Sequence, residues 1–185
     1  MIAVAPTEQL PVAQARTHDS QAWDQLFRRY QLPLYAFVFE LVRQEQPALD
    51  IVQETFVRAA KHLHTLLDDS KFGSWLFSIA HQQCARHGRK SHREQALDAE
   101  TIEEWVDDTP PPDAWLIRQE HAEALHEALE TLPPAHRCVI TLHFLEDFSL
   151  EEIADITQTP VGTVKSRLHY AKKALRRRFE ERHPL

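Results

Sequence analysis

Apolar residues recur at intervals of three and four positions along most of this chain, the spacing that gathers side chains on one side of an α-helix. The most regular run has intervals of 4, 3, 4 and 4 and consists of Val164, Leu168, Ala171, Leu175 and Phe179. No segment shows the apolar–polar alternation of a half-buried strand, and the chain has only 3 glycines for the turns of a β fold. The pattern predicts an all-α protein.

Three helices are predicted in the N-terminal half. The first covers about residues 20–44, with Asp19 or Ser20 as its N-cap, and Pro33 is expected to break or kink it. The second has Pro47 in its first turn and runs to about Leu66. A turn at residues 68–70 precedes the third, whose apolar side carries Phe72, Trp75, Leu76, Ile79 and Ala80.

Charge is distributed unevenly, although the net charge is −7. Residues 71–93 contain five basic and no acidic side chains, and residues 161–185 contain eight basic and two acidic ones. Between them, residues 94–130 carry twelve acidic side chains and one basic one. The distribution predicts two polyanion-binding surfaces, separated by a segment that avoids polyanions.

Three consecutive prolines at 110–112 close the acidic stretch and favour an extended spacer. We therefore expect a disordered leader at residues 1–18, a helical domain at 19–93, an acidic linker at 94–116 and a second helical domain at 117–185. The N-terminus lacks the basic region of a signal peptide, and no apolar run is long enough to span a membrane, so no membrane insertion is expected.

A helix-turn-helix is predicted in the second domain. Leu132 and the two prolines after it indicate that one helix stops and another begins, ending near residues 146–148. Ser149 and Glu152 then have the spacing of a capping box. Residues 157–160 form the expected turn, with Thr159 as N-cap and Pro160 as the first residue of the next helix.

That last helix combines the apolar run with a polar side that carries Thr163, Lys165, Ser166, Arg167, His169 and Tyr170. A short capped helix, a tight turn and a long basic amphipathic helix are typical of the motif whose second helix enters the DNA major groove. A solvated basic helix within a bundle is the alternative. Further basic residues suited to phosphates follow: Lys172, Lys173, Arg176, Arg177 and Arg178.

Several of these stretches resemble a known family. Residues 132–137, 139–140, 148–149, 152–154 and 162–168 resemble region 4 of the extracytoplasmic function (ECF) sigma factors, a subfamily of the sigma-70 factors. Residues 50–56, DIVQETF, resemble the family's region 2.2, and residues 72–80, FGSWLFSIA, resemble its regions 2.3 and 2.4. Finding both halves in the family's order strengthens the resemblance.

The resemblance implies a sigma factor that binds core RNA polymerase and directs promoter-specific initiation through the −10 and −35 elements. The polar face of the 50–56 helix, with Asp50, Gln53 and Glu54 at i, i+3 and i+4, would dock on the clamp helices of the polymerase β′ subunit. The six residues of the last helix, from Thr163 to Tyr170, would read the −35 element. An anti-sigma factor is implied as a further partner.

For the −10 element, the resemblance implies that the loop around residues 67–74 captures a flipped base. The implied contacts are Lys71, Ser74, Trp75, Arg86, Arg89 and Lys90, although helical spacing alone favours a core position for Trp75. The chain departs from the family at Ala85, where aspartate is usual, and at Gly88, where arginine is common.

The sequence contains no pattern that predicts a catalytic or metal-binding site. The best clusters, His62 with His64 and Cys84 with two nearby histidines, lack a recognised zinc spacing, so no metal or cofactor is expected. No nucleophile elbow or phosphate-binding loop appears, so an enzyme is not expected. Two cysteines cannot build a disulfide framework and suit the reducing cytoplasm. An operator-binding regulator and a protein-binding helical adaptor remain competing functions.

Overall fold

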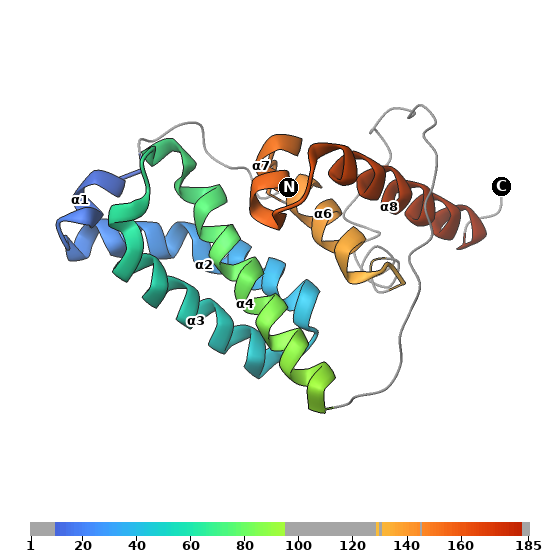
Figure 1. The fold of residues 1–185 in the computed structure, drawn as a ribbon, viewed down its shortest axis with the longest axis horizontal. Coiled ribbons are helices and arrows are strands. Elements are labelled where there is room, and N and C mark those ends of the chain that lie inside the picture. Colours follow the sequence, from blue (N-terminus) through green and yellow to red (C-terminus); the bar gives the residue numbers. More distant parts are fainter. Residues whose placement is uncertain (1–9, 95–128, 130, 145, 183–185) are drawn as a thin grey trace. The chain divides into compact units, whose positions relative to one another are not determined.

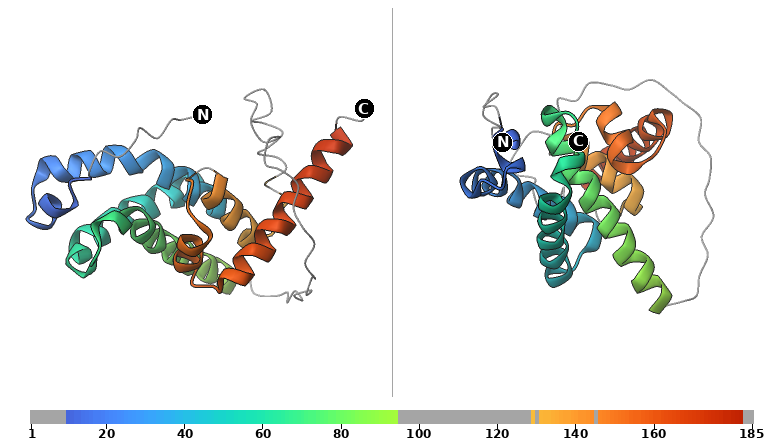
Figure 2. Two further views of the ribbon diagram at one scale, coloured as in Figure 1. Left: turned by 90° about the horizontal axis from the view of Figure 1, so that it is seen from above. Right: turned by 60° about the vertical axis from the view of Figure 1, so that its left-hand side comes forward.

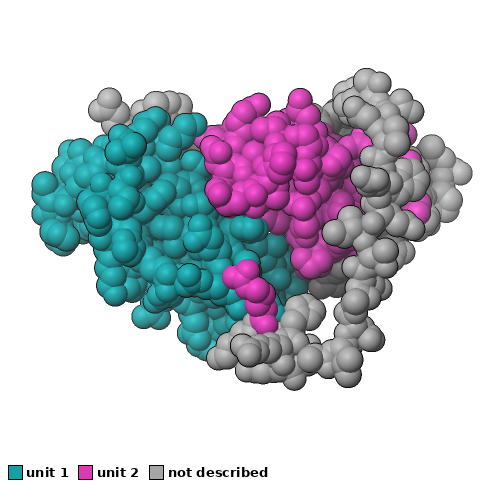
Figure 3. Space-filling model, viewed as in Figure 1, with its two compact units in different colours: residues 1–88 teal, residues 89–185 magenta. Residues whose placement is uncertain are grey.

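The structure is a computed structural model that describes residues 10–94, 129, 131–144 and 146–182. Every regular element in those ranges is helical, as the periodicity predicts (Figure 1). The chain divides into two compact units, residues 1–88 (unit 1) and residues 89–185 (unit 2), which Figure 3 colours separately. The predicted acidic linker, residues 94–116, lies outside the described residues except for Glu94, which is the last residue of a helix.

Unit 1 is built on three long helices, α2, α3 and α4. The elements in chain order are α1 (Val12–Arg16), α2 (Ser20–Val42), α3 (Glu45–His62), the 3₁₀ helices η1 (Leu63–Thr65) and η2 (Asp69–Lys71), and α4 (Phe72–Glu94), which continues past residue 88. The three helices lie side by side in both Figure 1 and Figure 2. Aromatic contacts join α2 to α4: the ring centroids of Phe37 and Phe77 lie 5.3 Å apart, and those of Tyr30 and Phe72 lie 5.5 Å apart.

Pro33 was expected to break or kink the first long helix. The break does not occur, because α2 continues through Pro33 to Val42. Proline removes one backbone hydrogen bond from a helix interior. The fully buried side chains of Leu34, Phe37 and Val38 directly follow it, so packing against the rest of unit 1 holds the helix together. At the start of α2, the predicted N-cap Asp19 accepts hydrogen bonds from the backbone N–H groups of residues 21 and 22.

The predicted disordered leader is also wrong for part of its length. Residues 12–16 form α1, in which Val12 is fully buried and Ala15 is buried. The indole Nε1–H of Trp23 on α2 donates to the Ala15 carbonyl at 2.9 Å. A five-residue helix is too short to show a period, and tertiary contacts, which no local pattern reveals, hold it in place. Residues 1–9 lie outside the described residues.

The second long helix ends earlier than its apolar pattern predicts. Helix α3 stops at His62, and the chain continues as η1 to Thr65, whose hydroxyl donates to the His62 carbonyl. Apolar spacing continues because Leu63 and Leu66 are both buried. The hydrophobic pattern shows which residues are buried, but it does not show where the α-helix gives way to the tighter 3₁₀ turn.

Unit 2 contains α6 (Pro134–Phe144), α7 (Leu150–Thr157) and α8 (Val161–Arg182). Helix α6 packs on α8, α7 packs on α8, and α6 also contacts α7. The helix restart predicted after Leu132 is confirmed, since α6 begins at Pro134. Fully buried side chains from all three helices form the core, among them Leu142, Ile153, Ile156 and Val164. None of the helices in the described ranges is long and apolar enough to cross a membrane.

Candidate nucleic-acid interface

Helix α7 begins with the predicted capping box. The Glu152 N–H donates to the Ser149 hydroxyl at 3.2 Å, and the Ser149 N–H donates to the Glu152 carboxylate at 3.1 Å. Two backbone N–H groups that the helix start leaves unpaired are thereby satisfied. Because Ile153 and Ile156 are fully buried, the cap fixes where this helix enters the core of unit 2.

The turn between α7 and α8 depends on a left-handed residue. Gln158 has φ 54° and ψ 42°, and its N–H and that of Thr159 both donate to the Ala154 carbonyl. Thr159 was expected to cap α8, but its hydroxyl lies 2.9 Å from the Thr157 hydroxyl instead. Helix α8 begins at Val161, and the carbonyl of Pro160 accepts its first backbone hydrogen bond. The predicted helix start is therefore one residue early.

Helix α8 presents two different sides. Val164, Leu168, Ala171 and Leu175 are buried, as predicted, and Phe179 lies outside the described side chains. Among the six predicted DNA-contacting residues, three are exposed and three are half-buried; the exposed ones are Lys165, Ser166 and Tyr170, and the half-buried ones are Thr163, Arg167 and His169. The structure thus places all six near the N-terminal half of α8, the part that reaches base edges in helix-turn-helix proteins.

His136 of α6 lies against this surface and was not singled out from the sequence. Its ring centroid lies 4.6 Å from that of Tyr170, at an interplanar angle of 53°. Burial, followed by the positive charge of Arg167, lowers the pKa of His136 from its usual 6.5. Tyr170 is therefore in contact with α6, and the charge of Arg167 lies close enough to act on His136. Residues 136 and 170 are too far apart in sequence for any local spacing to predict this contact.

The polar face predicted on the 50–56 segment forms on α3. Asp50, Gln53 and Glu54 are exposed, whereas Ile51, Val52, Thr55 and Phe56 are buried. The Glu54 carboxylate pairs with the Arg58 guanidinium at 2.6 Å, one helical turn further on. The exposed residues of this face can contact a protein partner without disturbing the core.

A short connection, residues 66–71, joins α3 to α4 and is called here the α3–α4 loop. Leu67 at its tip is 98% exposed. The carboxylate of the next residue, Asp68, accepts two hydrogen bonds from Ser70, one from its hydroxyl and one from its backbone N–H. These two hydrogen bonds lower the pKa of Asp68. Lys71 is exposed, and its carbonyl accepts a hydrogen bond from the Ser74 hydroxyl at 3.1 Å.

The predicted −10 residues fall into two groups on α4 and the loop before it. Lys71, Ser74 and Trp75 lie at the start of α4, where Trp75 is half-buried against Phe72. Arg86 and Arg89 are exposed further along the helix, about 15 residues and so roughly 20 Å away. The Lys90 side chain lies outside the described ones. At Gly88, no atom lies within 4 Å of an added Cβ.

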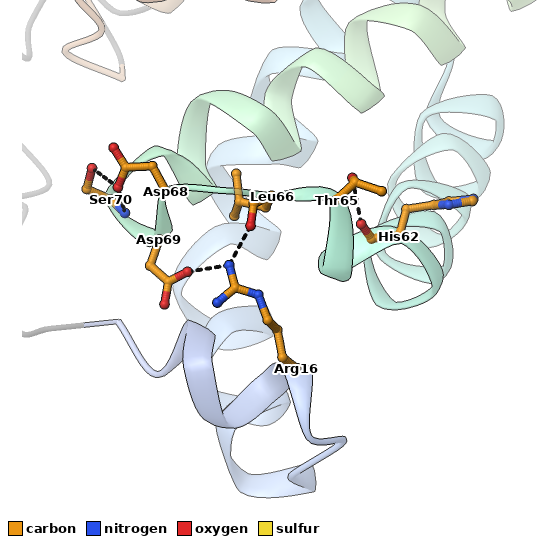
Figure 4. A network of polar contacts seen from close by, with 7 residues as sticks. All are labelled: Arg16, His62, Thr65, Leu66, Asp68, Asp69 and Ser70. Atoms are coloured by element: carbon orange, nitrogen blue, oxygen red, sulfur yellow. Dashed lines mark hydrogen bonds and ion pairs between the residues drawn. The ribbon is translucent and has the colours of Figure 1, made fainter.

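A side chain that sequence reasoning missed contacts the α3–α4 loop. The Arg16 guanidinium of α1 donates to the Leu66 carbonyl at 2.6 Å and pairs with the Asp69 carboxylate at 2.5 Å (Figure 4). Arg16 belongs to the stretch that was expected to be a disordered leader. No motif or period marks it, because the contact joins residues 50 positions apart.

Both cysteines lie within the described residues. Cys84 and Cys138 are free thiols and both are buried. Burial raises the pKa of Cys84 to about 12, which keeps it protonated. Within the described ranges, no three side chains of histidine, cysteine, aspartate or glutamate gather around one point.

Comparison with known families matches both units. The model of sigma-70 region 2 matches residues 26–94, which include the α3 face and the α3–α4 loop. The model of sigma-70 region 4 matches residues 122–175, which include α6, α7 and most of α8.

Curated relatives match over nearly the whole chain. The RNA polymerase sigma-H factor of Pseudomonas aeruginosa is 32% identical over 176 residues, which are 91% of this chain and 91% of that protein. The ECF RNA polymerase sigma-E factor of Escherichia coli is 32% identical over 177 residues, or 91% and 92% of the two chains. The ECF RNA polymerase sigma factor SigW of Bacillus subtilis is 29% identical over 178 residues, or 92% and 95%.

Two solved structures share the fold. CnrH, in complex with the cytosolic domain of CnrY, aligns with a TM-score of 0.66 and 23% identity, covering 94% of this chain and 97% of that one. The sigma factor RpoE from Bartonella quintana, in complex with the anti-sigma factor NepR, aligns with a TM-score of 0.64 and 24% identity, covering 84% and 97%.

Proposed function

The chain belongs to the extracytoplasmic function subfamily of the sigma-70 factors, and we propose how its residues divide the work of promoter recognition. As a sigma factor, it binds core RNA polymerase and directs initiation at promoters. The observation that carries the proposal is that one chain presents both an exposed polar face on α3 and an exposed basic face on α8. The chain acts in the cytoplasm, and its own residues carry out no catalytic step.

The −35 element is read by the N-terminal half of α8. Lys165 and Ser166 are exposed there, and Arg167 is half-buried close enough to His136 of α6 for its positive charge to lower the pKa of that histidine. Each of Lys165 and Arg167 that contacts a base edge contributes about 1–3 kcal/mol of discrimination.

This assignment is tested by comparing Lys165→Ala and Arg167→Ala with Lys173→Ala, an exposed residue two turns further along α8. The first two variants should lose selectivity among substituted −35 sequences. The third should weaken binding to all sequences about equally and reduce the salt dependence of binding, as expected for a phosphate contact. Unchanged −35 selectivity in both of the first two variants would place the recognition face elsewhere.

Core polymerase binds the α3 face. Asp50 and Gln53 are exposed on this face, and the buried residues between them fix its orientation. Asp50→Ala should impair assembly with core polymerase, and Asp24→Ala, which removes an exposed aspartate from α2, is the matched control. Native gel or fluorescence binding to core enzyme provides the measurement. Equal affinity of both variants for core enzyme would overturn the assignment.

The −10 element is contacted by the α3–α4 loop and by α4. We assign the flipped base to Lys71, Ser74 and Trp75 at the start of α4, and phosphate contacts to the exposed Arg86 and Arg89. A Cβ at position 88 meets no atom within 4 Å, so the first carbon of the arginine common in the family has room there. Gly88→Arg should therefore strengthen promoter binding without altering the fold, which gel-shift titration and circular dichroism would detect together.

An anti-sigma factor controls the chain, with the acidic segment 94–116 linking regions 2 and 4. The support is that the two solved structures described above are complexes, one of them with a protein named as an anti-sigma factor. A neighbouring gene for a membrane protein with a small cytoplasmic domain is the first candidate. Adding that cytoplasmic domain should suppress run-off transcription, and excess core polymerase should restore it.

The decisive experiment for the function as a whole combines three measurements on the full chain. It should co-purify with core polymerase, support run-off transcription and, on overexpression, raise a set of transcripts that share one promoter motif. A chain that neither binds core polymerase nor supports transcription, but binds duplex DNA tightly alone, would instead be an operator-binding regulator.

A further inference from the structure

The α3–α4 loop is tied to α1 by Arg16. The guanidinium Nη2 of Arg16 bonds the Leu66 carbonyl at 2.6 Å and the Asp69 carboxylate at 2.5 Å. In Figure 4, the Arg16 side chain rises from α1 toward these two groups. The two contacts lie on either side of the loop tip, residues 67 and 68, so together they bridge its two ends.

The tip itself has little to hold it. Leu67 is 98% exposed, and the Asp68 side chain bonds only within the loop in the contacts seen, to Ser70. A short loop with an exposed tip gains its conformation from the anchoring of its ends. The buried side chain of Leu66 anchors one end, and Arg16 joins that end to η2 at the other.

The helix that carries Arg16 is itself fixed. Val12 is fully buried and Ala15 nearly so, and the Trp23 indole donates to the Ala15 carbonyl at 2.9 Å. The Arg16 side chain is 29% exposed, so its charge is only partly screened by water. In the folded chain, α1 is therefore packed on α2, and Arg16 extends to the loop from a helix that is held by tertiary contacts.

The Arg16–Asp69 ion pair also changes the net charge of the α3–α4 loop. Asp68 and Asp69 place two carboxylates in a loop that the proposed function sets against DNA, whose phosphates would repel them. Arg16 neutralises Asp69, while the charge of Lys71 acts on Asp68. Without Arg16, the loop would keep its shape less well and would also carry an uncompensated negative charge.

We infer that Arg16 is a positioning residue that presets the α3–α4 loop and thereby sets the selectivity of the chain for the base received at the −10 element. The inference rests on the proposed function, because it requires that this loop receive a base. Arg16 precedes the residues 26–94 that match sigma-70 region 2, so the family match does not assign it a role.

The test compares Arg16→Ala and Asp69→Ala with the wild-type chain. Arg28→Ala is the matched control, because Arg28 forms an exposed ion pair with Asp24, and both residues belong to α2 and not to the loop. Each full-length protein is assembled with core polymerase on the same promoter, which is mapped from the transcripts of the wild-type chain. The −10 bases of that promoter are substituted one at a time, and open-complex formation is measured by permanganate reactivity on each template.

Arg16→Ala should reduce the ratio of open complex on the native template to that on the worst substituted template by roughly threefold to tenfold, a partial loss of the discrimination that a base contact gives. Asp69→Ala should give a smaller reduction, because the bond to Leu66 remains. Arg28→Ala should leave the ratio unchanged, and core-polymerase affinity should be unchanged in all three variants.

The ratio separates positioning from a general loss of structure. A structural defect would lower open-complex formation on every template by the same factor and leave the ratio intact, which would overturn the inference. If Arg16→Ala does not fold, Asp69→Ala decides: a reduced ratio supports the inference and an unchanged ratio refutes it. Failure of the wild-type chain to open any promoter would instead refute the proposed function.

Discussion

Replacing Glu146 with glutamine should stabilise unit 2 at neutral and alkaline pH and have little effect in acid. Glu146 lies between α6 and α7, where burial, followed by the charge of neighbouring Asp147, raises the pKa of its carboxyl from 4.5 to about 7. Below about pH 4.5 the group is protonated in both the folded and the unfolded chain. Above about pH 7, folding must bury a charged carboxylate, which the glutamine variant avoids.

The sign follows from proton binding. Between about pH 4.5 and pH 7, the folded chain retains a proton on Glu146 that the unfolded chain has released, so wild-type stability falls as pH rises through this window. A raised pKa of this size corresponds to about 3 kcal/mol at 1.36 kcal/mol per unit. Because Glu146 is only half-buried and water screens its charge, we expect about 1–2 kcal/mol at about pH 8.

Urea unfolding of the full chain, followed by far-UV circular dichroism from about pH 4 to pH 8, measures the difference between variant and wild type. His136 has a lowered pKa, so its contribution is present above pH 6.5 and is lost as pH falls through its folded pKa. Both proteins keep His136, so this contribution cancels. Asp147→Asn should give a smaller stabilisation of the same sign, since asparagine also tolerates the left-handed φ of 55°.

Asp155→Asn, which changes an exposed carboxylate on α7, is the matched control and should show no such dependence on pH. A Glu146→Gln variant that is equally or less stable than wild type at about pH 8 would refute the reasoning. That result would mean that the ionised carboxylate makes favourable contacts in the folded chain.

Three further predictions concern stability and reactivity. Ser149→Ala removes the hydroxyl that accepts from the Glu152 N–H, while the backbone N–H of residue 149 can still donate to the Glu152 carboxylate, and it should lower the unfolding free energy of unit 2 by about 1 kcal/mol in urea titration; no loss would mean that water replaces the hydroxyl. Gly88→Ala should raise the thermal unfolding midpoint, because glycine within a helix is less stable than alanine by about 0.5–1 kcal/mol. Gly73→Ala should not raise it, because the new Cβ would lie 3.1 Å from the Tyr30 hydroxyl. Cys84 should react with a thiol reagent only when the chain unfolds, because it is buried and protonated; rapid reaction of the native protein would contradict its placement.

Local patterns in the sequence predicted the features that depend on neighbours three or four residues apart. The Ser149 capping box, the buried side of α8 and the exposed Asp50 face all follow from helical spacing, and each appears in the structure as expected. The fold class followed from the same periodicity. Residue roles in contacting DNA and polymerase followed from the family resemblance and stay predictions.

Features that depend on distant residues could not be predicted. Helix α1 and the Arg16 contact require residues 50 positions apart, and the His136–Tyr170 contact joins two separate helices. Pro33 misled the prediction because a local penalty was weighed without the packing of α2 against its neighbours. The start of α8 differs from the predicted one by one residue, and the Thr159 hydroxyl lies 2.9 Å from the Thr157 hydroxyl.

The dependence of α1 on distant contacts also has a consequence for the order of folding. Five residues are too few to sustain a helix in water, so α1 can form only once the surface that it covers exists. Part of that surface, at η1 and Leu66, is synthesised about 50 residues later. During translation, α1 leaves the ribosome before the other described helices of unit 1, yet it should be the last of them to become stable, and hydrogen exchange in the finished chain should find it the first of them to open.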